Sequence, residues 1–335
     1  MIRPRFISAG DRIAVTAPSA GVSDPTDVRR FENAVSVLRG RGYDVTLTPN
    51  VYSDIGDGRS SSAEQRAKEA DSVLGDPGIA YVISAKGGDH LNEMFDHTDL
   101  SCISDAPKWV QGYSDNTDIL FRITTVYDIM SVYCGNFGDY GMEPWHRSIS
   151  ENLEFLEGKR TEQDSFDTYE SGFKDRITGL EPIEGDVPVR WTSDGNVSFS
   201  GIAIGGCTDK LRDMAGTGWD RVRDFAERYR DDGIVWYMET YASDATSFAD
   251  DLRKMRDNGW FEHAKGFVFG RPLFFEGDYV DTVRGVLEDL DLPIVFDADI
   301  GHKAPRMTII NGARMVVDVR DGRGRISYPG LTEDY

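Results

Sequence analysis

Short apolar runs alternate with helix-like segments along the first part of the chain. The strand-like runs are Arg12–Ala17, Tyr43–Leu47, Ile79–Ala85 and Lys108–Tyr113. Between them, apolar residues recur at helical spacing, as at Val28, Phe31, Val35 and Leu38, and a capping-box pattern opens a helix at Ser62-Ala63-Glu64-Gln65. Such alternation is typical of a parallel sheet with helices on both faces, and it places a functional site at the carboxyl edge of the strands.

A polar, charged stretch from Gly158 to Asp186 separates this segment from a second β/α segment. We therefore predict an N-terminal α/β domain over residues 1–160, a linker over 161–186 and a mixed β/α domain over 187–335. The length of 335 residues suffices for two such domains. The second domain is expected to contain strands at Val197–Ile204, Ile234–Glu239, Gly266–Gly270, Pro293–Phe296, Ala313–Val319 and Arg325–Tyr328, and helices that begin at Asp209, Ser243 and Tyr279.

Acidic residues dominate the charge of the chain. Asp plus Glu number 58 against 37 Lys plus Arg, which gives a formal net charge of −21. The acidic residues are spread along the whole sequence, so they form no acidic tail. A field of this sign repels nucleic acid, which we exclude as a partner. Abundant Asp with scarce Lys favours adaptation to high salt, and the alternative is an ordinary acidic cytoplasmic enzyme.

The sequence offers no sign of a membrane or secreted protein. No run approaches the roughly 20 apolar residues that span a bilayer, and the N-terminus has no apolar signal-peptide core. The three cysteines, Cys102, Cys134 and Cys207, are odd in number and far apart. This usage argues against a disulfide framework and predicts a reducing, cytoplasmic location.

The turn Gly112-Tyr113-Ser114-Asp115 stands between a strand-like run and a helix-like run from Asn116 to Tyr127. A sharp strand-to-helix turn of this kind exposes a serine hydroxyl at the sheet edge, as a nucleophile elbow does. The alternative is that Ser114 merely caps the helix. The second glycine of the α/β-hydrolase elbow is missing, because Asn116 occupies its place.

A glycine pair, Gly87-Gly88, follows another predicted strand. It is either a tight turn or a place where backbone N–H groups come close enough to a ligand to stabilise an oxyanion. The chain has neither the G-x-G-x-x-G fingerprint nor a phosphate-binding Gly-Lys-Ser/Thr loop, so no nucleotide cofactor is predicted.

Candidates for a base and an acid lie in the second half of the chain. Glu239 ends an apolar strand, where a carboxylate needs a bonding partner, and an arginine salt bridge is the simple alternative. His302 follows a strand and is either a structural loop residue or a catalytic base. The histidines have no metal-binding spacing, so no metal is predicted. Cys207 is expected to be a small buried thiol rather than a nucleophile.

Several motifs together resemble the LD-carboxypeptidase / microcin C self-immunity family of serine peptidases. They extend over the whole chain in family order: Gly10-Asp11-Arg12-Ile13-Ala14-Val15-Thr16-Ala17-Pro18-Ser19, Ser62-Ala63-Glu64-Gln65-Arg66-Ala67, Ala85-Lys86-Gly87-Gly88, Gly112-Tyr113-Ser114-Asp115, Gly205-Gly206 with Ala215-Gly216-Thr217, Met238-Glu239-Thr240 and Gly301-His302-Lys303-Ala304-Pro305.

The resemblance implies a role for each matched residue. Ser114 corresponds to the nucleophile, His302 to the general base and Glu239 to the acid that orients it, while the backbone N–H groups of Asp115, Gly87 and Gly88 correspond to the oxyanion hole. The family resemblance also implies a homodimer without a cofactor. Because the triad comes from both domains, we expect the active site in an interdomain cleft.

One departure bears on the substrate. Where family members often carry His-Gly-Pro, this chain has Tyr133-Cys134-Gly135-Asn136-Phe137-Gly138, which is similar to the microcin-immunity branch. Two substrate classes stay open: aminoacyl-nucleotide conjugates, for which Trp191, Trp219 or Trp145 is available to stack on a base, and L,D-linked peptides of the murein type. Arg271, with Lys303 as a further substrate-binding candidate, is suited to clamp a peptide carboxylate.

Two rival functions have different catalytic requirements. A catalytically silent binding protein of the same fold would not need all three triad residue types, which are retained here. A cysteine-dependent amidotransferase-like enzyme would need a cysteine at position 114, where the sequence has serine. We therefore predict a serine hydrolase that cleaves an amide bond.

Overall fold

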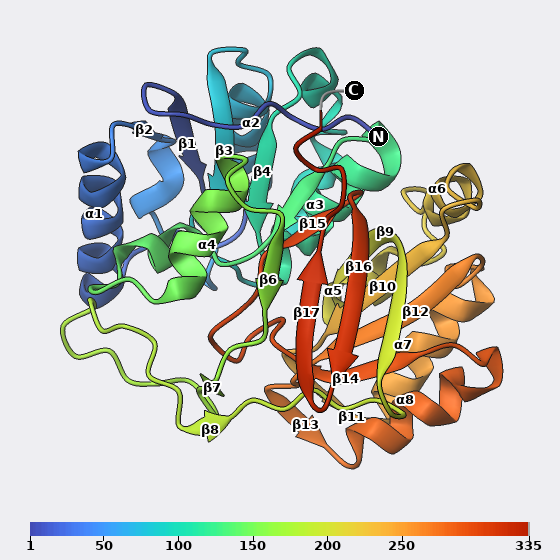
Figure 1. Cartoon of the computed structure of the whole chain (residues 1–335). Coiled ribbons are helices and arrows are strands. Elements are labelled where there is room, and N and C mark those ends of the chain that lie inside the picture. The colour runs from blue at the N-terminus through green and yellow to red at the C-terminus, as the bar shows by residue number, and fades with distance from the viewer. Residues whose placement is uncertain (334–335) are drawn as a thin grey trace. The chain divides into compact units, whose positions relative to one another are not determined.

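The computed structural model describes residues 1–333 and divides the chain into two compact units. Unit 1 comprises Met1–Arg160 and Lys174–Ile183, and unit 2 comprises Thr161–Phe173 and the chain from Glu184 onward. The polar stretch that the sequence marks as a linker is therefore divided, with its first part in unit 2 and most of the remainder in unit 1. Each unit is built around its own sheet (Figure 1).

Unit 1 has a parallel sheet with the strand order β5-β4-β3-β1-β2. The central strand β3 is buried along its whole length, which explains its continuous apolar sequence. Its strands are β1 (Arg12–Thr16), β2 (Asp44–Leu47), β3 (Ile79–Ser84), β4 (Trp109–Gly112) and β5 (Ser131–Tyr133), and its helices are α1 (Pro25–Gly40), α2 (Ala63–Leu74), α3 (Thr117–Tyr127) and α4 (Arg147–Leu156).

Local sequence signals account for the ends of these helices. The Asp24 carboxylate accepts hydrogen bonds from the backbone N–H groups of Thr26 and Asp27, so it caps α1, and Pro25 occupies the first turn. Ser62 caps α2 in the same way through the N–H of Gln65, at 3.2 Å. Because β1, β3 and β4 are parallel and adjacent, the turns that follow them lie along one edge of the sheet.

Unit 2 has a mixed sheet with the strand order β14-β12-β10-β9-β16-β17-β6. The first four strands in this order are parallel to one another, and β16, β17 and β6 continue the sheet in antiparallel fashion. The bounds are β6 (Glu162–Asp164), β9 (Val197–Cys207), β10 (Ile234–Glu239), β12 (Ala264–Gly270), β14 (Ile294–Ala298), β16 (Arg314–Arg320) and β17 (Arg323–Ser327).

The remaining elements of unit 2 are helices and short strands. The helices are α5 (Thr208–Met214), α6 (Val222–Arg228), α7 (Ala245–Asp257) and α8 (Tyr279–Leu287), and the short strands are β7 (Thr168–Tyr169), β8 (Val187–Pro188), β11 (Ala242–Asp244), β13 (Phe274–Glu276) and β15 (Ile309–Asn311). β10 is buried at every position and ends at Glu239, so the strand carries this carboxylate to the edge of an apolar layer.

The α/β class with a parallel sheet in the first half and a mixed sheet in the second half is as predicted. Short 3-10 helices occupy several connections of unit 1, namely Pro49–Tyr52, Leu91–Asp96, Ser101–Asp105, Ser114–Asn116 and Phe137–Gly141, and Glu288–Leu290 extends α8 in unit 2. Among residues 1–333, no helix has the length and apolar character needed to cross a bilayer.

Candidate active site

Ser114 lies directly after β4, in a short 3-10 turn that leads into α3. Its φ angle is +63°, a left-handed conformation that is unfavourable for a residue with a side chain. The backbone N–H of Ser114 donates to the hydroxyl of Tyr133 at 3.3 Å, and Thr117 Oγ1 donates to the Ser114 carbonyl at 2.6 Å. A strained backbone held in place from both sides is characteristic of functional turns.

Asn116 explains why the turn works without a second glycine. Its side-chain amide donates to the carbonyl oxygens of Lys86 at 3.1 Å and Tyr113 at 3.2 Å. Gly112 makes room for it, because a Cβ at this position would come within 2.7 Å of the Asn116 Cβ. The asparagine therefore ties the serine turn to the loop that follows β3.

That loop carries Gly87 and Gly88 close to the serine. A Cβ on Gly87 would lie 3.3 Å from Ser114 Oγ, so the backbone of this glycine borders the hydroxyl. A Cβ on Gly88 would lie 2.3 Å from Ser19 Oγ, so the second glycine is required by the loop after β1. The glycine pair thus permits a close backbone approach beside Ser114, as an oxyanion-binding loop requires.

The Asp115 side chain fastens these loops together. One carboxylate oxygen accepts a hydrogen bond from the backbone N–H of Leu91 at 3.0 Å and another from the hydroxyl of Ser19. Asp115 is fully buried, so these bonds compensate for its desolvation. The sequence predicts a role only for the backbone N–H of Asp115, so this contribution of its side chain was missed.

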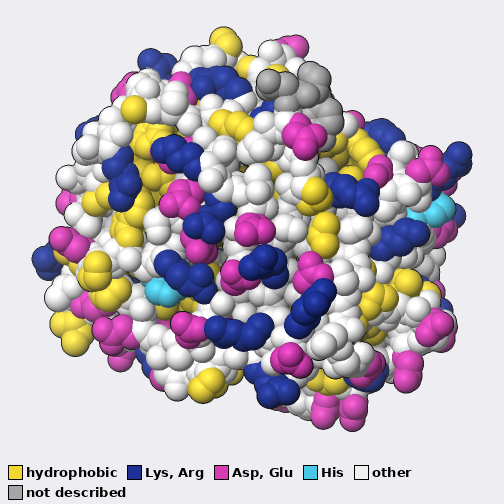
Figure 2. All heavy atoms as spheres, viewed as in Figure 1, with side chains coloured by type: hydrophobic (Ala, Val, Ile, Leu, Met, Phe, Trp, Pro, Cys, Tyr) yellow, Lys and Arg dark blue, Asp and Glu magenta, His cyan; other side chains and the backbone are white. Residues whose placement is uncertain are grey.

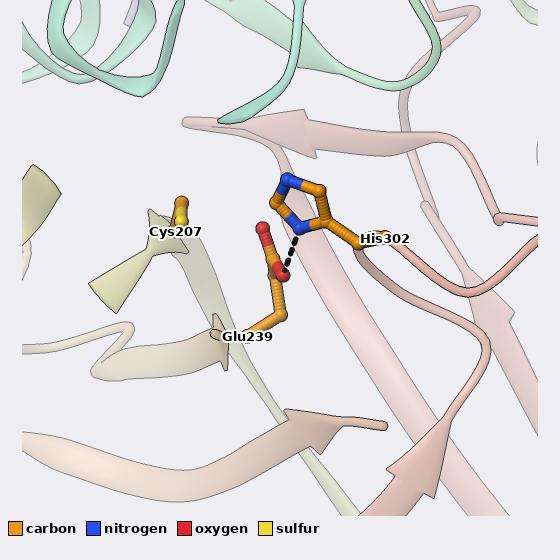
Figure 3. A group of neighbouring side chains, drawn as sticks. All are labelled: Cys207, Glu239 and His302. Atoms are coloured by element: carbon orange, nitrogen blue, oxygen red, sulfur yellow. Dashed lines mark hydrogen bonds and ion pairs between the residues drawn. The ribbon is translucent and has the colours of Figure 1, made fainter. Parts of the chain in front are cut away.

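Glu239 and His302 form a buried pair in unit 2. His302 Nδ1 lies 2.8 Å from Glu239 Oε2, and the two residues are 6% and 0% exposed (Figure 3). Glu239 ends β10, and His302 lies in the loop after β14. The carboxylate holds one ring nitrogen, which fixes the orientation of the imidazole and leaves the other nitrogen to act as an acceptor.

Two glycines allow the backbone segments around this pair to meet. Gly301 has φ +99°, and a Cβ there would lie 2.5 Å from Glu239 Oε2. A Cβ on Gly270, at the end of β12, would lie 3.1 Å from the Glu239 Cβ. The carboxylate therefore occupies space that any side chain at position 301 would take.

Cys207 completes the group shown in Figure 3. It ends β9, where the strand register places it opposite Glu239, and its thiol donates to Asp209 Oδ2 at 3.3 Å. Burial, together with the neighbouring carboxylates of Glu239 and Asp209, raises the pKa of the Cys207 thiol well above its ordinary value. A protonated, buried thiol is a poor nucleophile, so the geometry gives no support to a cysteine-dependent mechanism.

The three residues nevertheless offer one sulfur, one oxygen and one nitrogen ligand atom within 4.8 Å of one another. No metal site is predicted from the sequence, because the histidines and cysteines lack the spacing of short metal-binding motifs. Here the ligands come from two strand ends and a loop that are far apart in the sequence, so no such spacing exists.

Arg271 and Lys303 line a pocket of about 310 Å³ that Tyr169 and Tyr279 also border. Arg271 is almost fully buried, with Nη1 2.7 Å from Asp299 Oδ1 and its guanidinium carbon 4.1 Å from the centre of the Tyr169 ring. Burial and the neighbouring Arg271 lower the pKa of Lys303. Arg271 is therefore already engaged by a carboxylate, which makes it a weaker clamp for a substrate than its sequence context suggests.

Trp191 cannot stack on a ligand in this structure. It is 1% exposed, and its indole N–H donates to Asp299 Oδ2 at 3.0 Å. The binding role proposed for Trp191 on the basis of sequence is thus inconsistent with its burial. The exposed aromatic side chains of unit 2 lie elsewhere: Tyr241, two residues after Glu239, has its ring centroid 4.9 Å from that of His302.

Comparisons with known proteins match both halves of the chain. The model of the LD-carboxypeptidase N-terminal domain matches residues 13–134, and that of the LD-carboxypeptidase C-terminal domain matches residues 200–317. A provisionally named carboxypeptidase of Vibrio cholerae is 24% identical over 341 residues, with 95% of each chain covered. The microcin C7 self-immunity protein MccF of Escherichia coli is 21% identical over 334 residues, covering 93% of this chain and 92% of MccF.

Solved structures share the fold over nearly the entire chain. An MccF-like protein from Bacillus anthracis superimposes with a TM-score of 0.81 at 19% identity, covering 98% of this chain and 99% of that one. MccF in complex with aspartyl sulfamoyl adenosine gives a TM-score of 0.82 at 19% identity, with 98% of both chains covered. With both domain models matched in order, the chain belongs to the LD-carboxypeptidase family of peptidases.

Proposed function

We propose that the protein is a serine hydrolase that cleaves an amide bond of an aminoacyl-nucleotide type of conjugate. The observation that carries the proposal is the buried bond between His302 Nδ1 and Glu239 Oε2, at 2.8 Å. A carboxylate that accepts from one imidazole nitrogen holds the ring in the tautomer whose other nitrogen can accept a proton. The strained turn at Ser114, a residue that is only partly buried, supplies the hydroxyl that such a base would activate.

In the proposed mechanism, Ser114 Oγ attacks the carbonyl carbon while His302 Nε2 takes the hydroxyl proton. Glu239 stabilises the resulting imidazolium without accepting its proton. The tetrahedral intermediate collapses, the C–N bond breaks, and the imidazolium gives its proton to the leaving nitrogen. Water then attacks the acyl-serine ester with His302 again as base, which releases the acid and restores Ser114.

Backbone N–H groups at Asp115 and the Gly87-Gly88 loop would stabilise the negative oxygen of the intermediate. The closeness of Gly87 to Ser114 Oγ supports this role, since the missing side chain leaves the peptide backbone beside the reacting atom. The Asp115 carboxylate would act indirectly, because its bonds to Leu91 and Ser19 position both neighbouring loops.

Replacement of Ser114 tests the mechanism. We expect Ser114→Ala to lower kcat by on the order of 10³ or more, because no other group can form the ester. Ser114→Gly should be equally inactive but no less stable, since glycine tolerates the φ angle of +63°. Turnover and labelling by a fluorophosphonate probe are the measurements, with the exposed Ser101→Ala as the control. Hydrolysis near the wild-type rate in either Ser114 variant would contradict the proposal, and inactive wild-type protein would favour a silent binding protein.

An exposed group of aromatic side chains beside the Glu239–His302 pair (the dyad) supports an aminoacyl-nucleotide substrate. Phe173, Tyr241 and Phe274 are 62%, 40% and 52% exposed, and their ring centroids lie 5.6–6.3 Å apart. Of the three rings, that of Tyr241 lies next to His302, and exposed aromatic faces suit a planar base better than a flexible peptide. Structures related to this one include MccF with aspartyl sulfamoyl adenosine and an MccF-like protein of Streptococcus pneumoniae with AMP.

A substrate panel with a matched pair of variants tests this class. Wild-type protein should hydrolyse aspartyl sulfamoyl adenosine with a kcat/KM at least 10-fold above that for an L,D-dipeptide or a muropeptide. Phe274→Ala should raise KM for the nucleotide conjugate about 10-fold, which corresponds to one lost stacking contact, and should leave peptide hydrolysis unchanged. The exposed Ile177→Ala is the control for loss of an apolar side chain.

The second candidate, an L,D-carboxypeptidase, is favoured by the pocket that Arg271 and Lys303 line. Lys303 could pair with a terminal carboxylate there, whereas Arg271 is already engaged by Asp299. Preference for the L,D-dipeptide in the same panel, with loss of that activity in Lys303→Met, would establish this candidate instead.

A further inference from the structure

We propose that Cys207, Glu239 and His302 form a binding site for a thiophilic divalent cation, with Zn²⁺ as the probe, and that occupation of this site switches the hydrolase off. The binding itself follows from the geometry of unit 2 alone. The inhibition rests on the proposed function, because it requires Glu239 and His302 to be the acid and base of the reaction.

The ligand set is that of a zinc site. Thiolate, imidazole and carboxylate are the three protein ligands that Zn²⁺ prefers, and their atoms here all lie within 4.8 Å of one another. Around a tetrahedral zinc ion, bond lengths of about 2.0–2.3 Å place ligand atoms roughly 3.3–3.6 Å apart. Shifts of about 1 Å would therefore convert the present arrangement into a coordinating one, and a fourth position would be left open.

The surrounding backbone fixes the positions of the three ligand residues. Cys207 and Glu239 lie opposite each other in the register of two buried neighbouring strands, so their separation is set by the sheet. The loop that carries His302 is fixed by Arg306, whose Nε donates to the Gly301 carbonyl at 2.9 Å. Figure 3 shows the side chains of Glu239 and His302 meeting, with Cys207 beside them on a separate strand.

The electrostatics of the site favour a cation. The Asp209 carboxylate accepts from the Cys207 thiol and is itself fastened by Thr240 Oγ1 at 2.8 Å and by the Tyr241 N–H at 3.0 Å. Two carboxylates, Glu239 and Asp209, thus lie near one thiol and place negative charge around it. A divalent cation that replaces the thiol proton would neutralise this negative charge, and Asp209 would remain as an outer hydrogen-bond partner.

Occupation of the site would stop catalysis for a simple reason. A cation bound through His302 Nδ1 would replace the proton on that nitrogen and break its hydrogen bond to Glu239. The neutral ring would then carry its proton on Nε2, which could no longer accept the serine proton. A hard cation such as Mg²⁺ should have no such effect, since it prefers oxygen ligands and binds thiolate poorly.

Cobalt provides a direct readout of the proposed site. The chelator-treated full chain is titrated with Co²⁺ in excess Mg²⁺, which occupies carboxylate sites on the surface. We expect one equivalent to bind with a near-ultraviolet thiolate-to-cobalt absorption band, and Zn²⁺ to abolish that band by displacement. The variants Cys102→Ser and Cys134→Ser should retain the band, whereas Cys207→Ser should lose it and bind Zn²⁺ at least 100-fold more weakly by calorimetry.

Glu239→Gln and His302→Gln are a second test if Cys207→Ser does not fold. Each should weaken Zn²⁺ binding at least 10-fold while the thiol remains. Absence of the thiolate band in the wild-type protein, or an equal band in Cys207→Ser, would overturn the site. If the band forms but Zn²⁺ leaves turnover unchanged, the inhibitory role is wrong and the binding site stands. Because the cobalt titration needs no substrate, failure of the proposed hydrolase activity would not be confused with failure of the metal site.

Discussion

At the scale of single residues, the candidate site depends on positions where a side chain is missing. Gly301 is the sharpest case, since a methyl group there would lie 2.5 Å from Glu239 Oε2 and the φ angle of +99° is unfavourable for any other residue. The dyad can therefore form only because this position is glycine.

Replacement of Gly301 by alanine should harm both stability and activity. The strained backbone is expected to lower the free energy of unfolding by about 1–3 kcal/mol, and displacement of the Glu239 carboxylate should lower kcat at least 10-fold. Gly285→Ala, at an exposed position of α8 with nothing within 4 Å, should keep full activity and be slightly more stable. Steady-state kinetics and thermal unfolding measure the two effects, and a Gly301→Ala protein with wild-type kcat would show that the dyad geometry is unimportant.

At the same scale, sequence patterns located some residues of the site and missed others. Ser114, Gly87 and Gly88 could be found because each lies in a short turn after a recognisable strand. The place of Cys207 beside Glu239 depends on the register of two strands, and the aromatic group depends on the pairing of β11 with β13 across 32 residues, from Ala242 to Phe274. Trp191 was misjudged because nothing in its local sequence indicates that Asp299 holds it in the interior.

At the scale of whole elements, apolar periodicity was enough to predict the longer strands and most helices, whereas the short strands β5 and β6 were missed. α3 begins at Thr117 rather than at Asn116, because the chain first makes the 3-10 turn that displays Ser114. The division of the polar stretch between the two units could not be predicted, since it has few periodic apolar residues and its placement depends on contacts distant in sequence.

One buried lysine connects two elements of unit 1. Lys108 precedes β4, and its ammonium group donates to the carbonyl oxygens of Val73, at 3.1 Å, and Asp76, so it satisfies groups at the C-terminal end of α2. Burial lowers the pKa of Lys108 to about 8. At pH values between this pKa and the ordinary pKa of 10.5, Lys108 is protonated more in the unfolded chain than in the folded one. The contribution of Lys108 to the free energy of unfolding therefore rises with pH in this range.

Lys108→Met should remove this pH dependence. From pH 7.5 to pH 10, the free energy of unfolding of the wild-type protein should rise relative to that of the variant by about 1 kcal/mol, a figure reduced for the partial solvent screening of the site. Denaturant unfolding at the two pH values measures the difference, and the exposed Lys68→Met should behave like the wild type. A difference that stays constant or shrinks with rising pH would contradict this assignment.

At the scale of the whole molecule, charge is the dominant feature. The net charge of −21 arises from 58 acidic and 37 basic residues, and Figure 2 shows the two signs interspersed on the visible face. Arginine supplies most of the local compensation in pairs such as Arg5–Asp11, Arg256–Asp289 and Arg325–Asp164, each 2.6–2.7 Å long. Such exposed pairs contribute little individually, so the surplus of 21 negative charges should govern the response to salt.

The melting temperature is therefore expected to rise as KCl is increased from about 0.1 to 2 M, because the Debye length shrinks from about 10 Å to below 3 Å and the mutual repulsion of carboxylates is screened. Most of the rise should occur below about 0.5 M, where screening changes fastest, whereas a general salting-out effect would continue steadily. Replacing three exposed acids, Asp96, Asp105 and Asp257, by asparagine changes the net charge from −21 to −18 and should reduce the slope. If the melting temperature is flat or falls with KCl, the attraction lost in the screened ion pairs outweighs the repulsion that screening removes. High-salt adaptation would then be the wrong explanation for the acidic composition.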